Sequence, residues 1–315
     1  MTMRITGSMV VRSALNGMNA ARRQLSITQE QSASGLRVNR PSDDPVAASR
    51  ATQLRGESAE VEQYRHNVSQ ARARLGTTED AISSAEDAVV RARELAIEGA
   101  NGTLDANSRQ TLAKEVETLH DELLAASNAR SEGAWVFAGT ANGQPAFTSS
   151  GPFVSGSPPP TVTFGGNSTQ IEIAIDQGRR ATATLDGRRV FQGDADGDGS
   201  PDPGREDVFA VLGELWRALD TNDQAAVSAS LDRLDRVQGQ FQLELAHVGA
   251  ATQQLDAADQ RLSSQGLVVT KSLSDAQDAD TEQVFSRLVV QETALQAALE
   301  SASRAVQPSL LNFLK

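Results

Sequence analysis

The sequence predicts a mainly α-helical fold: an elongated antiparallel coiled-coil bundle with paired N- and C-terminal helices and a small inserted β-rich domain. Two rows of apolar residues, each spaced by seven, indicate helices that supercoil around a partner. The rows are Leu54, Val61, Val68, Leu75, Ile82 and Val89, extended by Ala47 and Ala96, and Val227, Leu234, Phe241, Val248, Leu255, Leu262 and Val269. Between about 133 and 206 the helical period gives way to short alternating runs, which predicts the β-rich insert.

The composition supports a helical bundle and disfavours several classes of function. Of the 315 residues 39% are apolar but only 4% aromatic, so Leu, Val and Ala build the core. The net charge of −12 disfavours a nucleic-acid partner, because phosphate backbones are bound by clustered Lys and Arg. The chain has no cysteine, which excludes disulfides, thiolate metal sites and a cysteine nucleophile.

The first elements are an amphipathic helix and a long helix. Apolar positions three and four residues apart predict a helix that ends near Gly35; they are Val11, Ala14, Met18, Ala21, Leu25 and Thr28. Asp44 can cap a second helix and Pro45 suits its first position. This helix, which carries the first heptad row, is expected to run to Gly99. The second seam positions, three residues after each member of the first row, are mostly small, which predicts a narrow seam. They are Tyr64, Ala71, Thr78, Ala85 and Ala92, with Glu57 as the exception.

A shorter helix and the insert follow. Leu112, Val116, Leu119, Leu123 and Ala126 predict a helix from about Asn107 to Arg130 that folds back beside the long one. Four runs read as strands. They are Trp135–Phe137, Thr161–Phe164, Gln170–Ile175 and Ala181–Leu185.

Helices return from Asp207 onward. Val208, Val211, Leu212, Leu215, Trp216 and Leu219 form the first stripe, and the second heptad row begins near Asp223. The last helix carries Val284, Leu288, Leu295, Ala298, Ala302 and Ala305, with Gln291 as a polar interruption and Pro308 as its expected end. We expect three regions: terminal assembly helices (1–44 and 285–315), a coiled-coil rod (45–132 and 207–284) and a β-rich outer domain (133–206).

A distinctive motif joins the first two predicted helices: Ser34-Gly-Leu-Arg-Val-Asn-Arg-Pro-Ser-Asp-Asp-Pro-Val-Ala47. It resembles the flagellin superfamily, and more narrowly its hook-filament junction branch, the hook-associated protein 3 family. Pro-Ser-Asp-Asp-Pro is similar to the junction proteins, whereas filament flagellins usually read Ala-Asp-Asp-Ala-Ala-Gly here. Met3–Thr6, Asn101–Leu104, Trp135–Gly139 and Ser309–Leu314 also resemble junction-protein segments.

This resemblance implies a structural subunit of the bacterial flagellum, outside the cell, in the layer between hook and filament. It implies export through the flagellar type III channel without a cleaved signal peptide, after binding to a cytosolic chaperone. The terminal helices would then pack with further copies and with neighbouring hook-associated protein and flagellin subunits in the wall of a ring or tube. The residues themselves indicate neither a signal peptide nor membrane insertion, since no apolar run approaches the roughly 20 residues that a bilayer requires.

One segment suggests metal chemistry. Asp194-Ala-Asp-Gly-Asp-Gly-Ser-Pro-Asp202 places Asp at positions 1, 3, 5 and 9 of a calcium loop and Gly199 at position 6. Position 12 is Arg205, where a bidentate Glu belongs, and Glu206 comes one residue late. A solvated acidic turn explains the segment more simply, so we assign no metal ligand.

No catalytic or cofactor-binding residue is assigned either. His66, His120 and His247 stand alone on predicted helices, where solvated surface histidines are common. The abundant carboxylates belong to the polar faces of heptad helices. The sequence therefore predicts a protein that is not an enzyme. Two alternatives to the junction protein remain, a filament flagellin and a secreted adhesion or calcium-binding module in which the insert is the working part.

Overall fold

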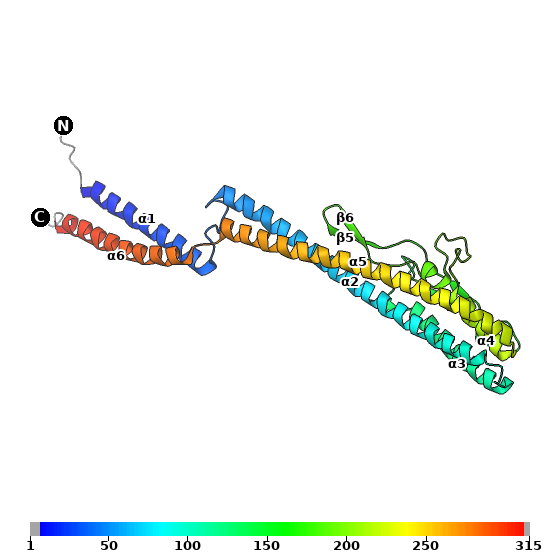
Figure 1. Ribbon diagram of the computed structural model, residues 1–315. Helices are drawn as coiled ribbons and strands as arrows, with labels where there is room; N and C mark the ends of the chain where they lie inside the picture. Colours follow the sequence, from blue (N-terminus) through cyan, green and yellow to red (C-terminus); the bar gives the residue numbers. More distant parts are fainter. Residues whose placement is uncertain (1–6, 312–315) are drawn as a thin grey trace. The chain divides into compact units, whose positions relative to one another are not determined.

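The computed structural model describes residues 7–311, with side chains described at residue 9 and from residue 11 to residue 303. The described chain forms six α-helices, drawn in Figure 1: α1 (Gly7–Ser34), α2 (Pro45–Gly99), α3 (Ala106–Ser127), α4 (Val208–Asp220), α5 (Gln224–Gln277) and α6 (Thr281–Leu311). Three two-stranded antiparallel sheets and a short π-helix lie between α3 and α4. The predicted fold class, mainly helical with a β-rich insert and paired terminal helices, is confirmed.

The chain divides into two compact units. One, which we call the terminal unit, joins residues 1–60 to residues 264–315; the other, the central unit, comprises residues 61–263. Both boundaries fall inside the long helices α2 and α5. The two ends of α2 and the start of α5 agree with the prediction to within a residue. The functional division of the chain expected above is a separate matter and stays a prediction.

The predicted seam forms the core of the central unit. From Val61 to Ala96 on α2, and from Val227 to Leu262 on α5, every residue of the two heptad rows is buried in one cluster. The small side chains at the second seam positions of α2 are completely covered: Ala71, Thr78, Ala85 and Ala92. Each large apolar side chain buried here contributes roughly 1.5 to 3 kcal/mol of gross stabilisation. A narrow, close-packed seam is therefore confirmed.

A buried arginine fastens one end of the central unit. Arg109 of α3 donates from Nε to the carbonyl oxygen of Gly99 and from Nη2 to that of Asn101, both at 2.8 Å. Its Nη1 donates to the side chain of Asn222, in the turn between α4 and α5. One side chain therefore satisfies carbonyls left open where α2 ends, and it joins two turns that are far apart in sequence.

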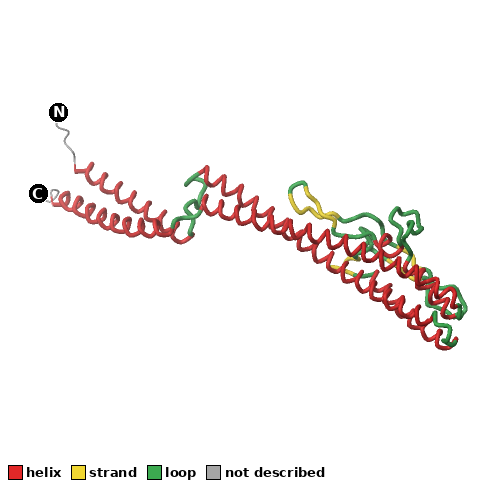
Figure 2. Tube along the Cα trace, viewed as in Figure 1, coloured by secondary structure: helices red, strands yellow, loops and turns green. Residues whose placement is uncertain are grey.

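The strands of the insert are placed differently from those that the sequence predicts. Its strands are β1 (Arg130–Ser131), β2 (Ala134–Trp135), β3 (Phe147–Ser149), β4 (Val162–Phe164), β5 (Glu172–Asp176) and β6 (Arg179–Thr182), paired as three separate hairpins. Figure 2 shows that loops make up most of this region. The predictions that Val136-Phe137 and Ala183–Leu185 are strand, and that α3 reaches Arg130, are wrong.

Side-chain contacts explain why Phe137 is not in a strand and why α3 ends before Arg130. Phe137 meets Phe191 edge to face at 5.0 Å between ring centroids, and Phe191 lies 5.8 Å from Phe241 of α5. Burying a ring against α5 is more favourable there than extending a hairpin. Asn128 ends α3 early because its side chain donates to the carbonyl of Phe147 at 2.8 Å and accepts from the Phe147 N–H at 2.9 Å.

The end of α6 also differs from prediction. The helix continues past Pro308 to Leu311, because a proline removes one N–H donor but keeps a φ angle that a helix accepts. The segments Met3–Thr6 and Asn312–Leu314, which contribute to the resemblance above, lie outside the described residues. No helix within residues 7–311 combines the length and apolarity required to span a membrane.

Candidate assembly surfaces

The terminal unit is built on the pair α1 and α6, which lie side by side (Figure 1). The predicted stripes are the covered sides of these helices, but most of their residues are only half-buried. They are Val11, Ala14, Met18, Ala21 and Leu25 on α1, and Leu288, Gln291, Leu295, Ala298 and Ala302 on α6. Among the stripe residues whose side chains are described, only Thr28 and Val284 are buried, and Ala305 lies outside those described side chains. Two helices alone cannot enclose their shared seam, so apolar surface remains for a further helix.

Exposed apolar side chains are concentrated in the same unit. Ten of the fourteen exposed large apolar residues within the described chain belong to it. They are Met9, Leu15, Ile27, Val46, Leu267, Val268, Phe285, Val289, Val290 and Leu299. Scattered exposed leucines are ordinary, but this density in the smaller unit is typical of a surface that other chains cover.

The motif that carries the resemblance, residues 34–47, forms a joint within the terminal unit. Leu36 pairs antiparallel with Asp278, and the N–H of Arg37 donates to the carbonyl of Gln277 at 2.7 Å. Gly35, with a φ of +71°, ends α1, and its carbonyl accepts the N–H of Ala279 at 2.9 Å. Glycine tolerates this left-handed conformation, which lets the chain reverse beside the end of α5.

Arg37 ties the joint to two helix ends. Its Nη2 donates to the carbonyl oxygen of Ala276, in the last turn of α5, at 2.8 Å. Its Nη1 lies 3.3 Å from Asp44 Oδ2. Asp44 also caps α2 as predicted, since its Oδ1 accepts the N–H of Ala47 at 3.0 Å, and that bond together with Arg37 lowers the pKa of Asp44. The motif thus has a structural explanation that requires no ligand.

We expect Arg37→Ala to loosen the joint. The substitution removes the bond to Ala276 and the ion pair, which together contribute about 1 kcal/mol at this half-exposed site. The backbone amides of Arg37, Val38 and Ala279 should then exchange with deuterium about fivefold faster. Arg40→Ala, which removes only an exposed ion pair to Glu30, is the control and should leave those rates unchanged. Equal protection in both variants would contradict the assigned role.

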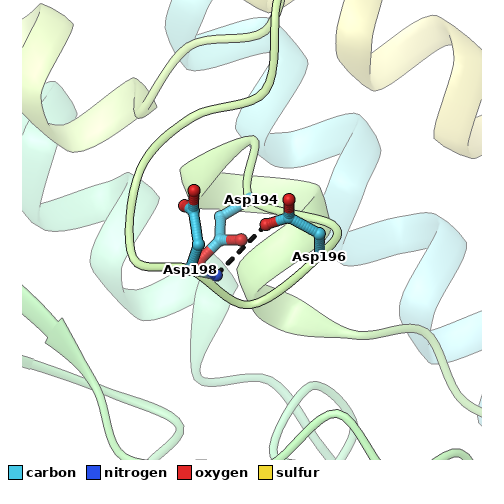
Figure 3. Close-up of side chains that lie close together, drawn as sticks. All are labelled: Asp194, Asp196 and Asp198. Carbon is cyan, nitrogen blue, oxygen red and sulfur yellow. Dashed lines mark hydrogen bonds between the residues drawn. The ribbon is translucent and has the colours of Figure 1, made fainter.

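The acidic loop brings three of its carboxylates together (Figure 3). Oxygens of Asp194, Asp196 and Asp198 lie within 4.8 Å of one another. However, Asp194 is buried and both of its oxygens accept backbone N–H groups, from Gly197 at 2.6 Å and Gly199 at 2.9 Å. Arg188 Nη1 also lies 3.7 Å from Asp194 Oδ2.

Arg205, at position 12 of this loop, makes its ion pair outside the loop. The side chain of Arg205 pairs with Glu244 and does not turn towards the aspartates. The loop is closed by hydrogen bonds from its own backbone N–H groups to the carboxylate of Asp194. The absence of a metal ligand stays a prediction. We expect calorimetric titration with Ca²⁺ to give no saturable heat. Saturable heat that disappears in the Asp196→Asn, Asp198→Asn double variant would establish a calcium site instead.

The sequence predicts that all three histidines are solvated, but His120 is buried, with 1% of its side chain exposed. Its ring meets Phe153 and Phe209 edge-on, at 4.9 and 5.7 Å between centroids. Neither ring nitrogen has a hydrogen-bond partner within the described chain, and burial lowers the pKa of His120. Its position, four residues after Val116 and three before Leu123, places it on the buried stripe of α3 and could have revealed this.

A second feature missed from the sequence is a buried ionic cluster on α5. One oxygen of Glu244 accepts from Arg189 Nε at 3.0 Å and from Arg205 Nη1 at 3.1 Å. The Glu244 side chain is completely buried, and its other oxygen has no partner within the described residues. Nearby, Gln240 donates to the carbonyl of Val190 at 2.8 Å. These contacts attach the last part of the insert to α5.

Comparison with known proteins places these surfaces in context. Residues 5–142 match the family described as the bacterial flagellin N-terminal helical region. Flagellar hook-associated protein 3 of Escherichia coli (strain K12) is 28% identical over 95% of this chain and 96% of its own length. The flagellar filament 41 kDa core protein of Borreliella burgdorferi is 36% identical, but over only 34% of this chain and 32% of its own.

The fold is shared with a solved structure. The crystal structure of Xanthomonas campestris FlgL aligns with a TM-score of 0.56 at 19% identity, covering 69% of this chain and 98% of that one. The similarity to this filament protein thus extends over 34% of the chain, whereas the similarity to hook-associated protein 3 extends over 95% of it. The resemblance predicted from the motifs is confirmed, since the chain is similar to flagellar hook-associated protein 3 over almost its whole length.

Proposed function

We propose that this chain is a structural subunit of the bacterial flagellum that forms the junction layer between hook and filament. The observation that carries the proposal is the nearly full-length similarity to hook-associated protein 3, set against similarity over about a third of the chain to filament proteins. We propose no enzymatic activity, because the features described above serve packing and assembly.

The terminal helices, 1–44 and 285–315, are proposed to build the inner wall of this layer. The concentration of exposed apolar side chains in the terminal unit supports this assignment. Their partners would be further copies of this chain, arranged as a ring or tube, and adjoining hook-associated protein and flagellin subunits. Regions 45–132 and 207–284 would form the rod, and region 133–206 would face outward.

We further propose that the chain reaches the flagellum without a cleaved signal peptide and is held by a cytosolic chaperone before export. The exposed apolar face of α6, which includes Phe285, Val289 and Val290, supports a need for such protection. The bacterium should secrete the protein with its N-terminal sequence uncut. N-terminal sequencing of protein recovered from detached flagella tests this, and a shortened N-terminus would contradict it.

The double variant Phe285→Asp, Val289→Asp should fold normally but fail to join hook and filament. Both side chains are exposed, by 58% and 63%, so the free energy of unfolding should change by about 0.5 kcal/mol or less. Two charges on this face would have to be desolvated by any apolar partner. Motility in soft agar, with unattached filament protein measured in the medium, reports the loss of joining.

Leu243→Asp is the matched control, because Leu243 is also 58% exposed but lies in the central unit. It should leave motility intact. Deletion of residues 1–33 and 285–315 should likewise give a soluble protein that does not add to hooks. If the double variant or the deleted protein still assembled, the role of the terminal helices would be refuted.

Immunogold labelling of intact flagella tests the location directly. A single band at the distal end of the hook is expected. Label along the filament would instead support a filament flagellin.

A further inference from the structure

A small polar pocket lies between the insert and α5, within the central unit. It has a volume of about 180 Å³, and its apolar lining comes from α2, from α5 and from Leu185 of the insert. Its polar lining consists of Gln170, Thr182, Thr184, Arg189 and His247. No carboxylate lines it in the described structure, although the chain has 41 acidic and only 29 basic residues other than histidine. This selection of side chains favours a negatively charged guest.

Arg189 gives the pocket its charge. The Nε of Arg189 is fixed 3.0 Å from Glu244 Oε1, and Arg205 occupies the same oxygen. Two guanidinium groups therefore share one carboxylate, which leaves the trio with a net charge of +1. Within the described chain, the two terminal amino groups of Arg189 donate to no hydrogen-bond acceptor. A guanidinium held by one edge, with its other edge unused, is pre-organised to bind an anion through two parallel bonds.

The neighbouring groups add donors. Thr184 is buried, and its Oγ1 is held in place by accepting the N–H of Ile171 at 2.8 Å, which leaves the hydroxyl hydrogen to donate. Gln170 carries an amide NH₂ and His247 an imidazole N–H, both at the exposed rim. The volume equals that of about six water molecules, sufficient for a carboxylate or a phosphate with part of its hydration shell.

We propose that this pocket binds a small oxyanion, a carboxylate or a phosphate group, with Arg189 as its main ligand and His247, Thr182 and Thr184 as further donors. The proposal is independent of assembly, because the site lies in the central unit and uses none of the exposed apolar residues of the terminal unit. Whether the ligand is a carboxylate or a phosphate is decided by which of two probes binds, acetate or inorganic phosphate.

Isothermal titration of the full-length chain, at constant ionic strength in a zwitterionic buffer, tests the site with inorganic phosphate in one arm and acetate in the other. One anion per chain should bind with a dissociation constant in the millimolar range. Arg189→Lys keeps a cation beside Glu244 but removes the planar fork, and should weaken binding at least tenfold. His247→Gln, at an exposed position, should weaken it about threefold.

Arg180→Gln is the control, since Arg180 is a 68% exposed arginine on the adjacent strand β6 and lies outside the pocket. It should bind like the unaltered protein. Circular dichroism melts check that each variant folds, and His247→Gln tests the pocket even if Arg189→Lys does not fold. Absence of saturable heat with either anion, or binding that both pocket variants retain in full, would overturn the proposal.

Discussion

Glu244→Ala is expected to lower the free energy of unfolding by about 3 kcal/mol, because removing one member of a buried ionic cluster leaves the others uncompensated. Two arginines depend on this carboxylate, and their side chains are only 30% and 21% exposed. Because water can reach both arginines in part, the expected loss of stability lies at the low end of the range for a fully buried ionic cluster. Urea denaturation followed by circular dichroism measures the change.

Two further variants separate the cluster from an ordinary ion pair. Glu244→Gln keeps the volume and an acceptor but loses the charge, so we expect a smaller loss than for alanine. Asp256→Ala on the same helix removes an exposed pair with Arg72 and should cost no more than about 1 kcal/mol. If Glu244→Ala lowers the free energy of unfolding no more than Asp256→Ala does, the buried cluster stabilises the fold no more than an exposed ion pair.

The second large effect is on the pH dependence of stability. Burial lowers the pKa of His120 in the folded protein below the value of about 6.5 that it has in the unfolded chain, and the carboxylate of Asp121, 3.9 Å from Nδ1, opposes this only weakly. Above pH 6.5 both states carry a neutral ring and the linkage is silent. As pH falls below 6.5, the unfolded chain takes up a proton that the folded one does not, so stability falls by up to about 1.4 kcal/mol per pH unit.

The comparison with His120→Leu isolates this residue, because both proteins retain His66 and His247. At pH 7.5 the leucine variant should be at least as stable as the unaltered chain, since it removes two buried nitrogens that have no partner. As the pH falls from 6.5 to 5.5 its advantage should grow, by at most about 1 kcal/mol, measured as the difference in urea midpoints multiplied by the slope. Parallel pH profiles of the two proteins would refute this account of His120.

The helices could be predicted closely because their signals are local and repeated. The heptad row from Leu54 to Val89 and the cap at Asp44 fix α2 without any knowledge of its partner, and the row from Val227 to Val269 does the same for α5. The half-covered stripes of α1 and α6 likewise follow from three- and four-residue spacing. Each of these elements agrees with its own sequence at the level of periodicity, capping and burial.

The insert and the joint could not be predicted in this way, since long-range contacts decide them. Phe147 begins a strand only because Asn128 and Phe164 meet it. The Gly35–Val38 segment follows the predicted end of α1 and pairs with residues 277–279, a contact for which the sequence carries no local signal. The same holds for Glu244, which on a heptad helix looks like a solvated acid until two arginines from the insert are placed against it.

The pairing of α1 with α6 also sets an order of events in time. Loop-closure entropy rises with the length of chain between two contacts, so contacts near the α3–α4 end of the helices can form first and the first and last helices are expected to meet last. If the chain emerges one end first, the terminal helix that emerges early has no partner. It stays unpaired until nearly all of the sequence has followed. The pairing of α1 with α6 is thus postponed by the connectivity of the chain itself.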